Sequence, residues 1–165
     1  MKKSKLIKLM SIVLAVFSTT VLAADIQVEW TNPDDYRDVR SANESKKRFQ
    51  ERTFEKLDKH FTELASKLPE GYQLVVKVTD VDLAGNVEFG RTQQIRIVRQ
   101  IHFPRMDLEY QLFDDKKQLI STEKAELKDM SFLNSIKTRA GSQTLSYEKH
   151  MIEEWFNKTF SQYMG

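Results

Sequence analysis

The sequence contains no cysteine, and this absence excludes several kinds of chemistry. Without thiols the chain forms no disulfide, has no thiolate nucleophile and offers no cysteine for lipid attachment or for a zinc site. Glycine and proline are also scarce, with five and three residues in a chain of 165. The glycine patterns that hold phosphates and dinucleotides are absent, as is the G-x-S-x-G elbow of serine hydrolases. The sequence therefore carries no recognisable catalytic motif.

Histidine is scarce as well, with only His60, His102 and His150. None of the three stands at metal-ligand spacing from another, and there is no H-E-x-x-H pattern. We therefore expect no metal centre and no cofactor.

The amino terminus is typical of a secretory signal peptide. Four lysines, at positions 2, 3, 5 and 8, precede an apolar stretch over 9–16 and a run of small residues. The stretch is shorter than the roughly 20 apolar residues of a spanning helix, so no membrane span is expected. Cleavage after Ala23 predicts residues 1–23 as the signal and 24–165 as a single mature domain, although cleavage after Ala24 is also acceptable. The predicted location is the periplasm.

The net charge of the mature chain argues against two classes of function. The formal charge of the whole sequence is +2, but removal of the four signal lysines leaves 22 basic against 24 acidic residues, about −2. A general nucleic-acid binder neutralises phosphates with lysine and arginine, and a membrane-surface protein is typically basic. Nucleic acid is therefore not an expected partner, and the charge also argues against a basic membrane-surface protein.

Hydrophobic periodicity predicts an α+β fold. Apolar residues that alternate with polar ones indicate strands, and apolar residues at three- and four-residue intervals indicate helices. The predicted strands cover 26–30, 72–83, 94–103, 106–113 and 118–127. The predicted helices cover 45–68 and 145 to about 160, with Ser41, Asn43 and Ser45 as alternative caps of the first. Residues 114–117 are an expected hairpin turn and 134–144 an expected loop. The expected architecture is an antiparallel or mixed sheet of about five strands with two amphipathic helices packed on one face.

Two carboxylates stand at the end of the second predicted strand, in the stretch VTDVDLAG (78–85). Side-chain alternation puts Asp80 and Asp82 on the apolar face of that strand. The same count along 94–103 puts Arg99 in register with isoleucines and puts Arg96 on the opposite, solvated face. Because a buried guanidinium needs a carboxylate partner, we predict that Arg99 pairs with Asp80 or Asp82 at the rim of the core.

Other interpretations of the two carboxylates fit less well. In a calcium-binding loop, Ala84 and Arg91 would stand where oxygen ligands are required. A glycosidase pair must face across a sugar, which neighbours on one strand rarely do. A structural ion pair is therefore favoured over a ligand-binding rim, and the rim over a catalytic pair.

Four segments together carry a family resemblance: NPDDYRDVR (32–40), VTDVDLAG (78–85), DMSFL (129–133) and YEKHMIEEWF (147–156). In combination they resemble the bacterial domain-of-unknown-function family 3016. The resemblance implies an exported protein of Gram-negative bacteria with one α/β domain and no assigned activity. It supplies no catalytic residue.

The sequence favours a non-enzymatic binding or accessory protein of the bacterial envelope, with an envelope protein or a small ligand as its partner. The candidate binding residues are Asp80, Asp82, Arg99, Tyr36, Asp38 and Arg40. One alternative is a hydrolase of envelope glycan or lipid that uses Asp80 or Asp82 as acid or base with a histidine partner. Another is a self-assembling structural subunit, which would show a large exposed apolar patch or an open sheet edge.

Overall fold

The computed structural model describes residues 24–90, 92–134 and 144–164. The predicted signal peptide, residues 1–23, lies outside the described residues, and so do positions 135–143 of the expected loop. In the described ranges no helix has the length and apolar character to cross a membrane.

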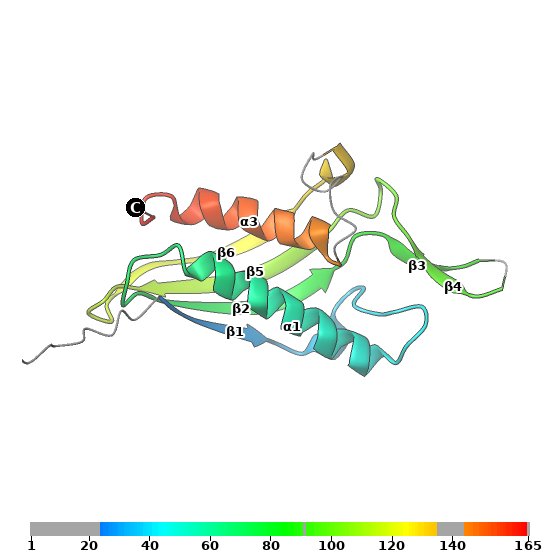
Figure 1. The fold of residues 1–165 in the computed structure, drawn as a ribbon, viewed down its shortest axis with the longest axis horizontal. Helices are drawn as coiled ribbons and strands as arrows, with labels where there is room; N and C mark the ends of the chain where they lie inside the picture. Colours follow the sequence, from blue (N-terminus) through cyan, green and yellow to red (C-terminus); the bar gives the residue numbers. More distant parts are fainter. Residues whose placement is uncertain (1–23, 91, 135–143, 165) are drawn as a thin grey trace, which may run out of the picture.

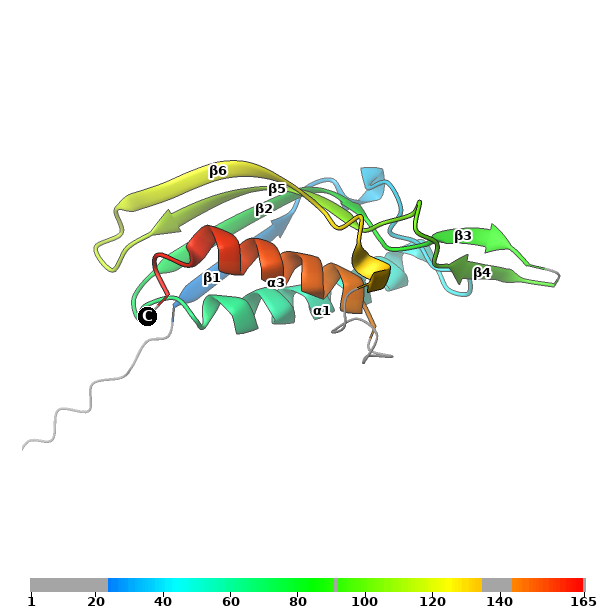
Figure 2. The same ribbon diagram turned by 90° about the horizontal axis from the view of Figure 1, so that it is seen from above.

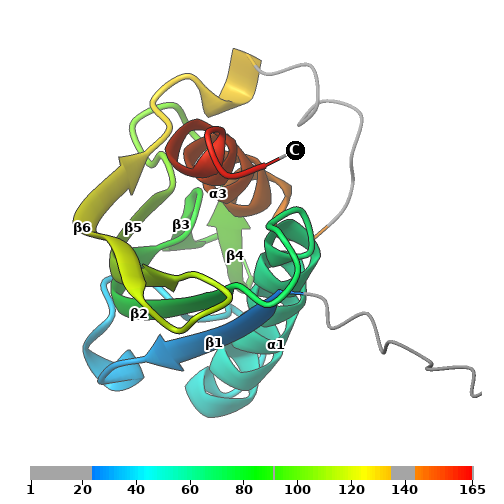
Figure 3. The same cartoon turned by 90° about the vertical axis from the view of Figure 1, so that its left-hand side faces the viewer.

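A mixed sheet and two helices make up the body of the molecule. The elements are β1 (Asp25–Trp30), η1 (Pro33–Asp35), α1 (Lys46–Ala65), β2 (Gln73–Asp82), β3 (Asn86–Phe89), β4 (Gln94–Ile97), β5 (Arg105–Phe113), β6 (Leu119–Lys128), η2 (Phe132–Asn134) and α3 (Ser146–Phe160). The sheet has the order β1-β2-β5-β6, with β1 parallel to β2 and the other neighbours antiparallel. Both helices lie on the same face of this sheet (Figures 1 and 3). The predicted α+β class with two helices on one face is confirmed.

The first helix begins directly after its N-cap residue. Of the three alternative caps, Ser45 is the one used, because its side-chain oxygen accepts a hydrogen bond from the backbone N–H of Arg48 at 3.4 Å. One face of α1 then buries Leu57, Phe61 and Leu64 against the sheet. Since α1 connects β1 to β2, the two strands can run parallel, which a tight hairpin would not allow.

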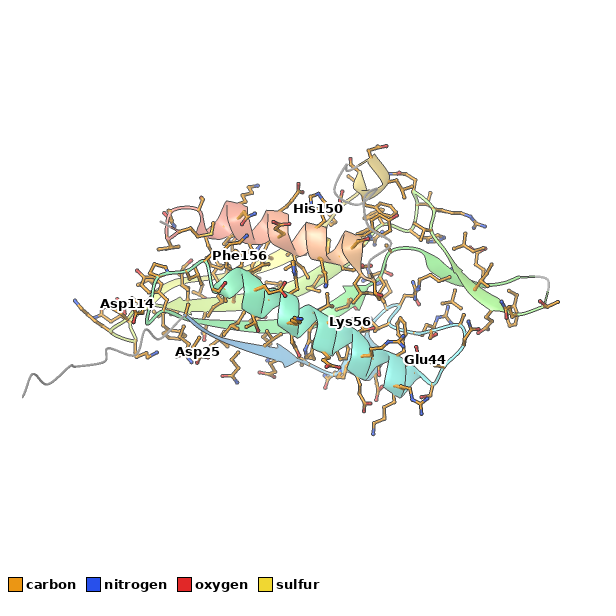
Figure 4. All side chains as sticks on the ribbon, viewed as in Figure 1. Asp25, Glu44, Lys56, Asp114, His150 and Phe156 are labelled. Carbon is orange, nitrogen blue, oxygen red and sulfur yellow. The ribbon has the colours of Figure 1, made fainter. Side chains whose placement is uncertain are left out.

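The core lies between the sheet and the helices, and the other face of the sheet is polar. Leu74, Val76 and Val78 of β2 are completely buried, and Phe156 of α3 packs in the same cluster (Figure 4). On the open face a charged row crosses all four strands in register: Glu29, Lys77, Glu109 and Lys124. The signs alternate along the row, and Lys124 lies 2.6 Å from Glu109. The open face is thus a solvated surface.

A β-bulge at Thr79 reverses the alternation of β2. Val78 pairs with Leu108 and Asp80 pairs with Asp107, so Thr79 is an extra residue on β2. Because one inserted residue moves every following side chain to the other face, Val81 is buried and Asp80 is not. The prediction that Asp80 and Asp82 share the apolar face of β2 is therefore wrong.

The predicted strand over 94–103 is too long. Only Gln94–Ile97 is a strand, and β4 pairs with β3, which the sequence analysis did not predict. The two strands form a separate antiparallel hairpin that projects from one end of the body (Figures 1 and 2). After β4 the chain turns, with the N–H of His102 donating to the carbonyl of Arg99 at 2.9 Å. The main sheet consequently has four strands.

Gly85 makes the turn between β2 and β3 possible, and its substitution tests the close approach seen there. Its φ is +83°, and an added Cβ would lie 2.7 Å from the carbonyl oxygen of Ile97. We predict that Gly85→Ala lowers the free energy of unfolding by about 2–4 kcal/mol, from left-handed backbone strain and from displacement of β4. Urea denaturation measures the loss.

Gly71 is the matched control, because its φ is +81° but an added Cβ would meet only the side chain of Asp115 at 3.2 Å and its Cα at 3.5 Å. Gly71→Ala should lose mainly the strain component, about 1–2 kcal/mol, because its contact with Asp115 is less severe than that of Gly85 with Ile97. Equal losses in the two variants would show that the contact between Gly85 and β4 contributes nothing.

Candidate functional site

Asp80 holds the segment that follows β1 against the end of β2. One carboxylate oxygen accepts the backbone N–H groups of Arg37 at 3.0 Å and Val81 at 2.9 Å. The other lies 3.1 Å from the guanidinium of Arg37, which also lies 4.0 Å from Asp82. The arginine partner of Asp80 is therefore Arg37, whereas Asp82 lies near both Arg105 and Arg37. Asp80 anchors a loop.

Arg99 is not the partner that the sequence predicted. Its guanidinium binds both carboxylate oxygens of Glu88, at 2.6 and 3.0 Å, in a fork-like pair at the surface of the hairpin. The predicted pairing with Asp80 or Asp82 is wrong because residues 98–103 do not continue β4 beside β2. The prediction had counted Arg99 as part of a strand that runs to residue 103.

Arg96 makes the buried ion pair instead, although the sequence analysis had placed it on a solvated face. Its guanidinium donates to Asp38 at 2.9 Å, to the carbonyl of Gly85 at 3.1 Å and to the carbonyl of Arg40 at 2.8 Å. The other carboxylate oxygen of Asp38 accepts from the Nε of Arg40 at 3.1 Å. Only 8% of Asp38 is exposed. This network fastens the base of the hairpin to the segment that follows β1.

Tyr36 has a structural role at this end of the molecule. Its hydroxyl donates to the carbonyl of Val78, next to the bulge, at 2.9 Å. Burial raises the pKa of Tyr36 to about 12, so the phenol stays neutral. Asp38 forms an isolated parallel bridge with Asp82. The structure thus brings five of the six predicted residues to one end of β2 and leaves Arg99 on the hairpin.

Glu148 is a site residue that the sequence analysis missed. It stands in the first turn of α3, is 3% exposed, and accepts the backbone N–H of Ala84 at 2.7 Å. Burial raises the pKa of its carboxyl, while the hydrogen bonds and Arg96 oppose that shift. A signal was present, because Glu148 lies three and four residues before the buried Met151 and Ile152 and so interrupts an apolar stripe.

A pocket of about 390 Å³ lies beside the turn of Leu83, Ala84 and Gly85. Its walls come from the segment before α1, α1, the end of β2, β4 and the start of α3. The main apolar lining residues are Phe49, Leu83, Ile95, Val98, Leu145 and Tyr147. Arg96 and Glu148 supply charged groups in the wall. An apolar cavity with a few convergent polar groups is the usual form of a ligand site.

A second cavity of about 400 Å³ lies between β6 and α3. Its lining includes Ala125, Met151 and Trp155, with Glu126, Lys128, Asp129, Glu154 and Lys158 as its charged residues. All five of these charged residues keep some exposure to solvent, unlike Glu148. Volume does not separate the two cavities, so the buried polar groups make the first one the candidate site.

In the part of the chain that the structure describes, the side chains form no metal site, and His60 and His150 lie away from Asp80. Those residues contain no group of three or more His, Asp or Glu side chains able to hold a metal ion. The ring Nε2 of His60 donates to the carbonyl of Lys149 at 2.9 Å, between the two helices, and His150 lies on α3 (Figure 4). Asp80 lies on the face of the sheet opposite the helices, so these two histidines are not placed to act with it.

These features define an α+β protein with a projecting hairpin and a pocket beside a turn that Glu148 and Arg96 bind. The chain belongs to the family described as protein of unknown function, DUF3016, whose family model matches residues 24–158. A solved structure titled as a minor lipoprotein from Acinetobacter baumannii is similar over 84% of this chain and 89% of that chain, with 11% identity and a TM-score of 0.28. A likeness at that score carries no functional argument. The comparison with curated proteins gave no match.

The two ion pairs of the hairpin should differ sharply in their contribution to stability. The side chains of Arg96 and Asp38 are 22% and 10% exposed, whereas those of Arg99 and Glu88 are 51% and 28% exposed. We predict that Arg96→Met lowers the free energy of unfolding by about 3 kcal/mol, because it leaves Asp38 buried with less compensation. Arg99→Met should cost about 0–1 kcal/mol.

Thermal unfolding of the two variants beside the native protein measures the difference. At this chain length 1 kcal/mol moves the midpoint by roughly 2–5 °C, so Arg96→Met should melt about 10 °C lower. Equal midpoints for the two variants, or a larger loss for Arg99→Met, would contradict the assignment of the buried pair.

Proposed function

We propose that this chain is an exported, non-enzymatic binding protein of the bacterial envelope that works in the periplasm. Its binding site is the pocket beside Leu83, Ala84 and Gly85, and its ligand is a small apolar molecule or an apolar side chain of an envelope protein. The observation that carries the proposal is the pocket itself, in which apolar walls from separate segments surround a buried carboxyl group.

The charged residues favour binding in this pocket over binding at Asp80. Asp80 already accepts two backbone N–H groups and the guanidinium of Arg37, so little of its hydrogen-bonding capacity is left for a ligand. The pocket, in contrast, offers apolar surface from Phe49 and Tyr147 that a ligand can cover. Its volume lies within the range of small-molecule sites, roughly 300–1,000 Å³.

The contacts of Glu148 favour a binding protein over a hydrolase. A buried carboxyl with a raised pKa is a feature of general acids, and Glu148 has that feature. One of its oxygens, however, holds the N–H of Ala84 at 2.7 Å and thereby joins α3 to the turn. Of the carboxylates first considered for catalysis, Asp80 is bound by Arg37, and Asp82 lies near Arg105 and Arg37.

Two observations support export, and both point to the same start of the mature chain. The signal-like segment predicts cleavage after Ala23, and the family match begins at residue 24. Cells that express the full chain should therefore yield a periplasmic protein. Its measured mass should match a chain that begins at Ala24 or Asp25. Retention of the whole 165-residue chain in the cytoplasm would contradict export. The same preparation serves for the binding test.

The binding test uses the neutral apolar dye N-phenyl-1-naphthylamine as a probe. We expect saturable binding with one site per chain, seen as a rise in dye fluorescence. Ala42→Trp places an indole at the pocket wall and should weaken dye binding at least tenfold, which is about 1.4 kcal/mol.

Ala125→Trp is the matched control, because Ala125 lines the second cavity, which has nearly the same volume. This variant should bind the dye as the native protein does. A loss of binding in Ala125→Trp with none in Ala42→Trp would move the site to the second cavity. Native affinity in both variants would contradict a ligand site in either cavity.

A further inference from the structure

We propose that β6 and α3 form a docking site for an extended peptide segment of another protein. The segment adds to the main sheet as a fifth strand beside β6 and inserts one large apolar side chain between β6 and α3. The space for that side chain is the second cavity, of about 400 Å³. The proposal does not use the pocket beside Leu83, Ala84 and Gly85, so it goes beyond the proposed function.

The edge of the sheet at β6 is open to a further strand. Within the described residues, β6 has a partner strand on one side only, β5. The N–H of Asp129 donates to the carbonyl of Pro104 at 3.3 Å, and these two residues continue the register of β6 with β5. Hydrogen-bonded and non-hydrogen-bonded pairs alternate along an antiparallel ladder. Counting back from Asp129, the N–H and C=O groups of Lys128 and Glu126 therefore point away from β5.

The strand on the other side of β5 gives the same assignment. Asp107 stands opposite Glu126, and its carbonyl accepts the hydroxyl of Thr79 on β2 at 3.2 Å. Since the carbonyl of Asp107 faces β2, it does not bond to the N–H of Glu126. The edge of β6 thus points main-chain donors and acceptors outward, which is the template that an added strand requires.

The second cavity runs along this edge. Five consecutive residues, 125–129, line it. Because side chains alternate between the two faces of a strand, a cavity that touches five residues in a row follows the edge of the strand. Its other wall is a single stripe of α3 with helical spacing: Met151, Glu154, Trp155 and Lys158. This stripe is about 10 Å long and the strand segment about 13 Å. The cavity is therefore an elongated groove between a strand and a helix.

The groove is shaped for a large apolar side chain. Ala125 has only a methyl group on the strand side, and Met151 is buried on the helix side. Trp155 is half-buried, and its ring makes a T-shaped contact with Tyr110 at 5.8 Å between centroids, so apolar surface on it is left for a ligand. A backbone that pairs with a sheet edge and a side chain that enters a pocket are the two features of peptide recognition by strand addition.

A second copy of this chain would fill the groove poorly. If two copies paired through β6, the side chains on the helix face of one β6 would meet the groove of the other. Those side chains are Glu123, Ala125 and Leu127. Glu123 is charged, Ala125 is small, and Leu127 is 6% exposed and packs in its own core. The occupant is therefore a segment of a different protein, with a large apolar residue at the position that faces α3.

The opposite edge of the sheet is not equivalent. At the end of β1, the ring of Trp30 stacks on Phe54 of α1 with centroids 4.4 Å apart, and its indole N–H donates to Asp58 at 2.9 Å. Side chains of the chain itself thus fill the space between β1 and α1. Figure 3 shows β1 beside α1 at one edge and β6 beside α3 at the other. The groove lies at the β6 edge.

Selection from a phage library of random nine-residue peptides tests the site. The mature chain, residues 24–165, should enrich sequences in which a large apolar residue stands among β-branched residues. A synthetic peptide with the most enriched sequence should bind Ala125→Trp at least about tenfold more weakly than the native protein, because the indole would occupy the groove. Failure to enrich any sequence, or equal binding by the two proteins, would overturn the proposal.

Ala42→Trp is the matched control for this variant, because Ala42 lines the other pocket. It should bind the peptide as the native protein does. It should also lose the dye N-phenyl-1-naphthylamine, whereas Ala125→Trp should keep the dye and lose the peptide. Since the two proposals use different cavities, peptide binding without dye binding would overturn only the proposed ligand site. Dye binding without peptide binding would overturn only the docking site.

N-methylation of the peptide distinguishes strand addition from insertion of a side chain alone. Two versions of the synthetic peptide would carry N-methyl groups on alternate residues, one at the odd positions and one at the even positions. Only every second amide of an added antiparallel strand bonds to its neighbour. One version should therefore lose at least about tenfold in affinity, and the other should bind as the unmodified peptide does. Equal affinities of the two versions would contradict strand addition.

Glu126→Pro tests the same hydrogen bonds from the side of the protein. Proline removes the N–H that points outward and leaves the bonds between β6 and β5 in place, and edge strands accept proline at such positions. The variant should bind the peptide at least about tenfold more weakly, whereas Glu126→Gln, which keeps the N–H, should bind normally. Native affinity in a folded Glu126→Pro variant would overturn the proposal.

Sedimentation velocity distinguishes a foreign peptide from a second copy. Without peptide, the native mature chain should remain monomeric at about 200 μM. A dimer that Glu126→Pro or Ala125→Trp abolishes would show that a second copy occupies the edge of β6, and it would overturn the assignment of the site to another protein.

Discussion

The buried ion pair between Arg96 and Asp38 is the interaction on which the hairpin end of the molecule depends. One guanidinium joins the segment after β1, the turn between β2 and β3, and β4. Removing either partner would leave a charge in a poorly solvated position, which is why such pairs fix geometry more than they add net stability. The pocket wall formed by β4 is placed by this contact, and Glu148 holds the same turn from the side of α3.

The bulge at Thr79 explains how acidic residues in VTDVDLAG serve this arrangement. By turning Asp80 and Asp82 away from the core, it presents them to Arg37. The same inserted residue turns Val81 inward, so the end of β2 remains part of the core. The stretch is thus a strand that changes faces and then enters a buried turn. Asp80 binds the backbone N–H of Arg37, next to Asp38, and the pocket lies beside the turn of Leu83 and Ala84.

Much of the fold could be predicted from the sequence, because long periodic segments report burial directly. The helix over 46–65 and the long strands of the sheet follow from such patterns. The family resemblance was confirmed. The bulge has no comparable signal, since a single inserted residue leaves the composition of a strand unchanged, and it reversed the predicted facing of Asp80. The four-residue β3 was too short to show a period. Of the site, the segment with Tyr36 and Asp38 was predicted, whereas Arg96 was assigned to the wrong face and Glu148 was overlooked.

A double-mutant cycle between Asp38 and Arg96 tests the central claim most directly. The free energy of unfolding would be measured for the native protein, Asp38→Asn, Arg96→Met and the double variant. We predict a coupling of about 2–3 kcal/mol, because after the first substitution the second removes a charge that has already lost its main opposite charge, although Asp38 still contacts Arg40. Additive losses, with a coupling below about 0.5 kcal/mol, would contradict the role of this pair in holding the hairpin to the body.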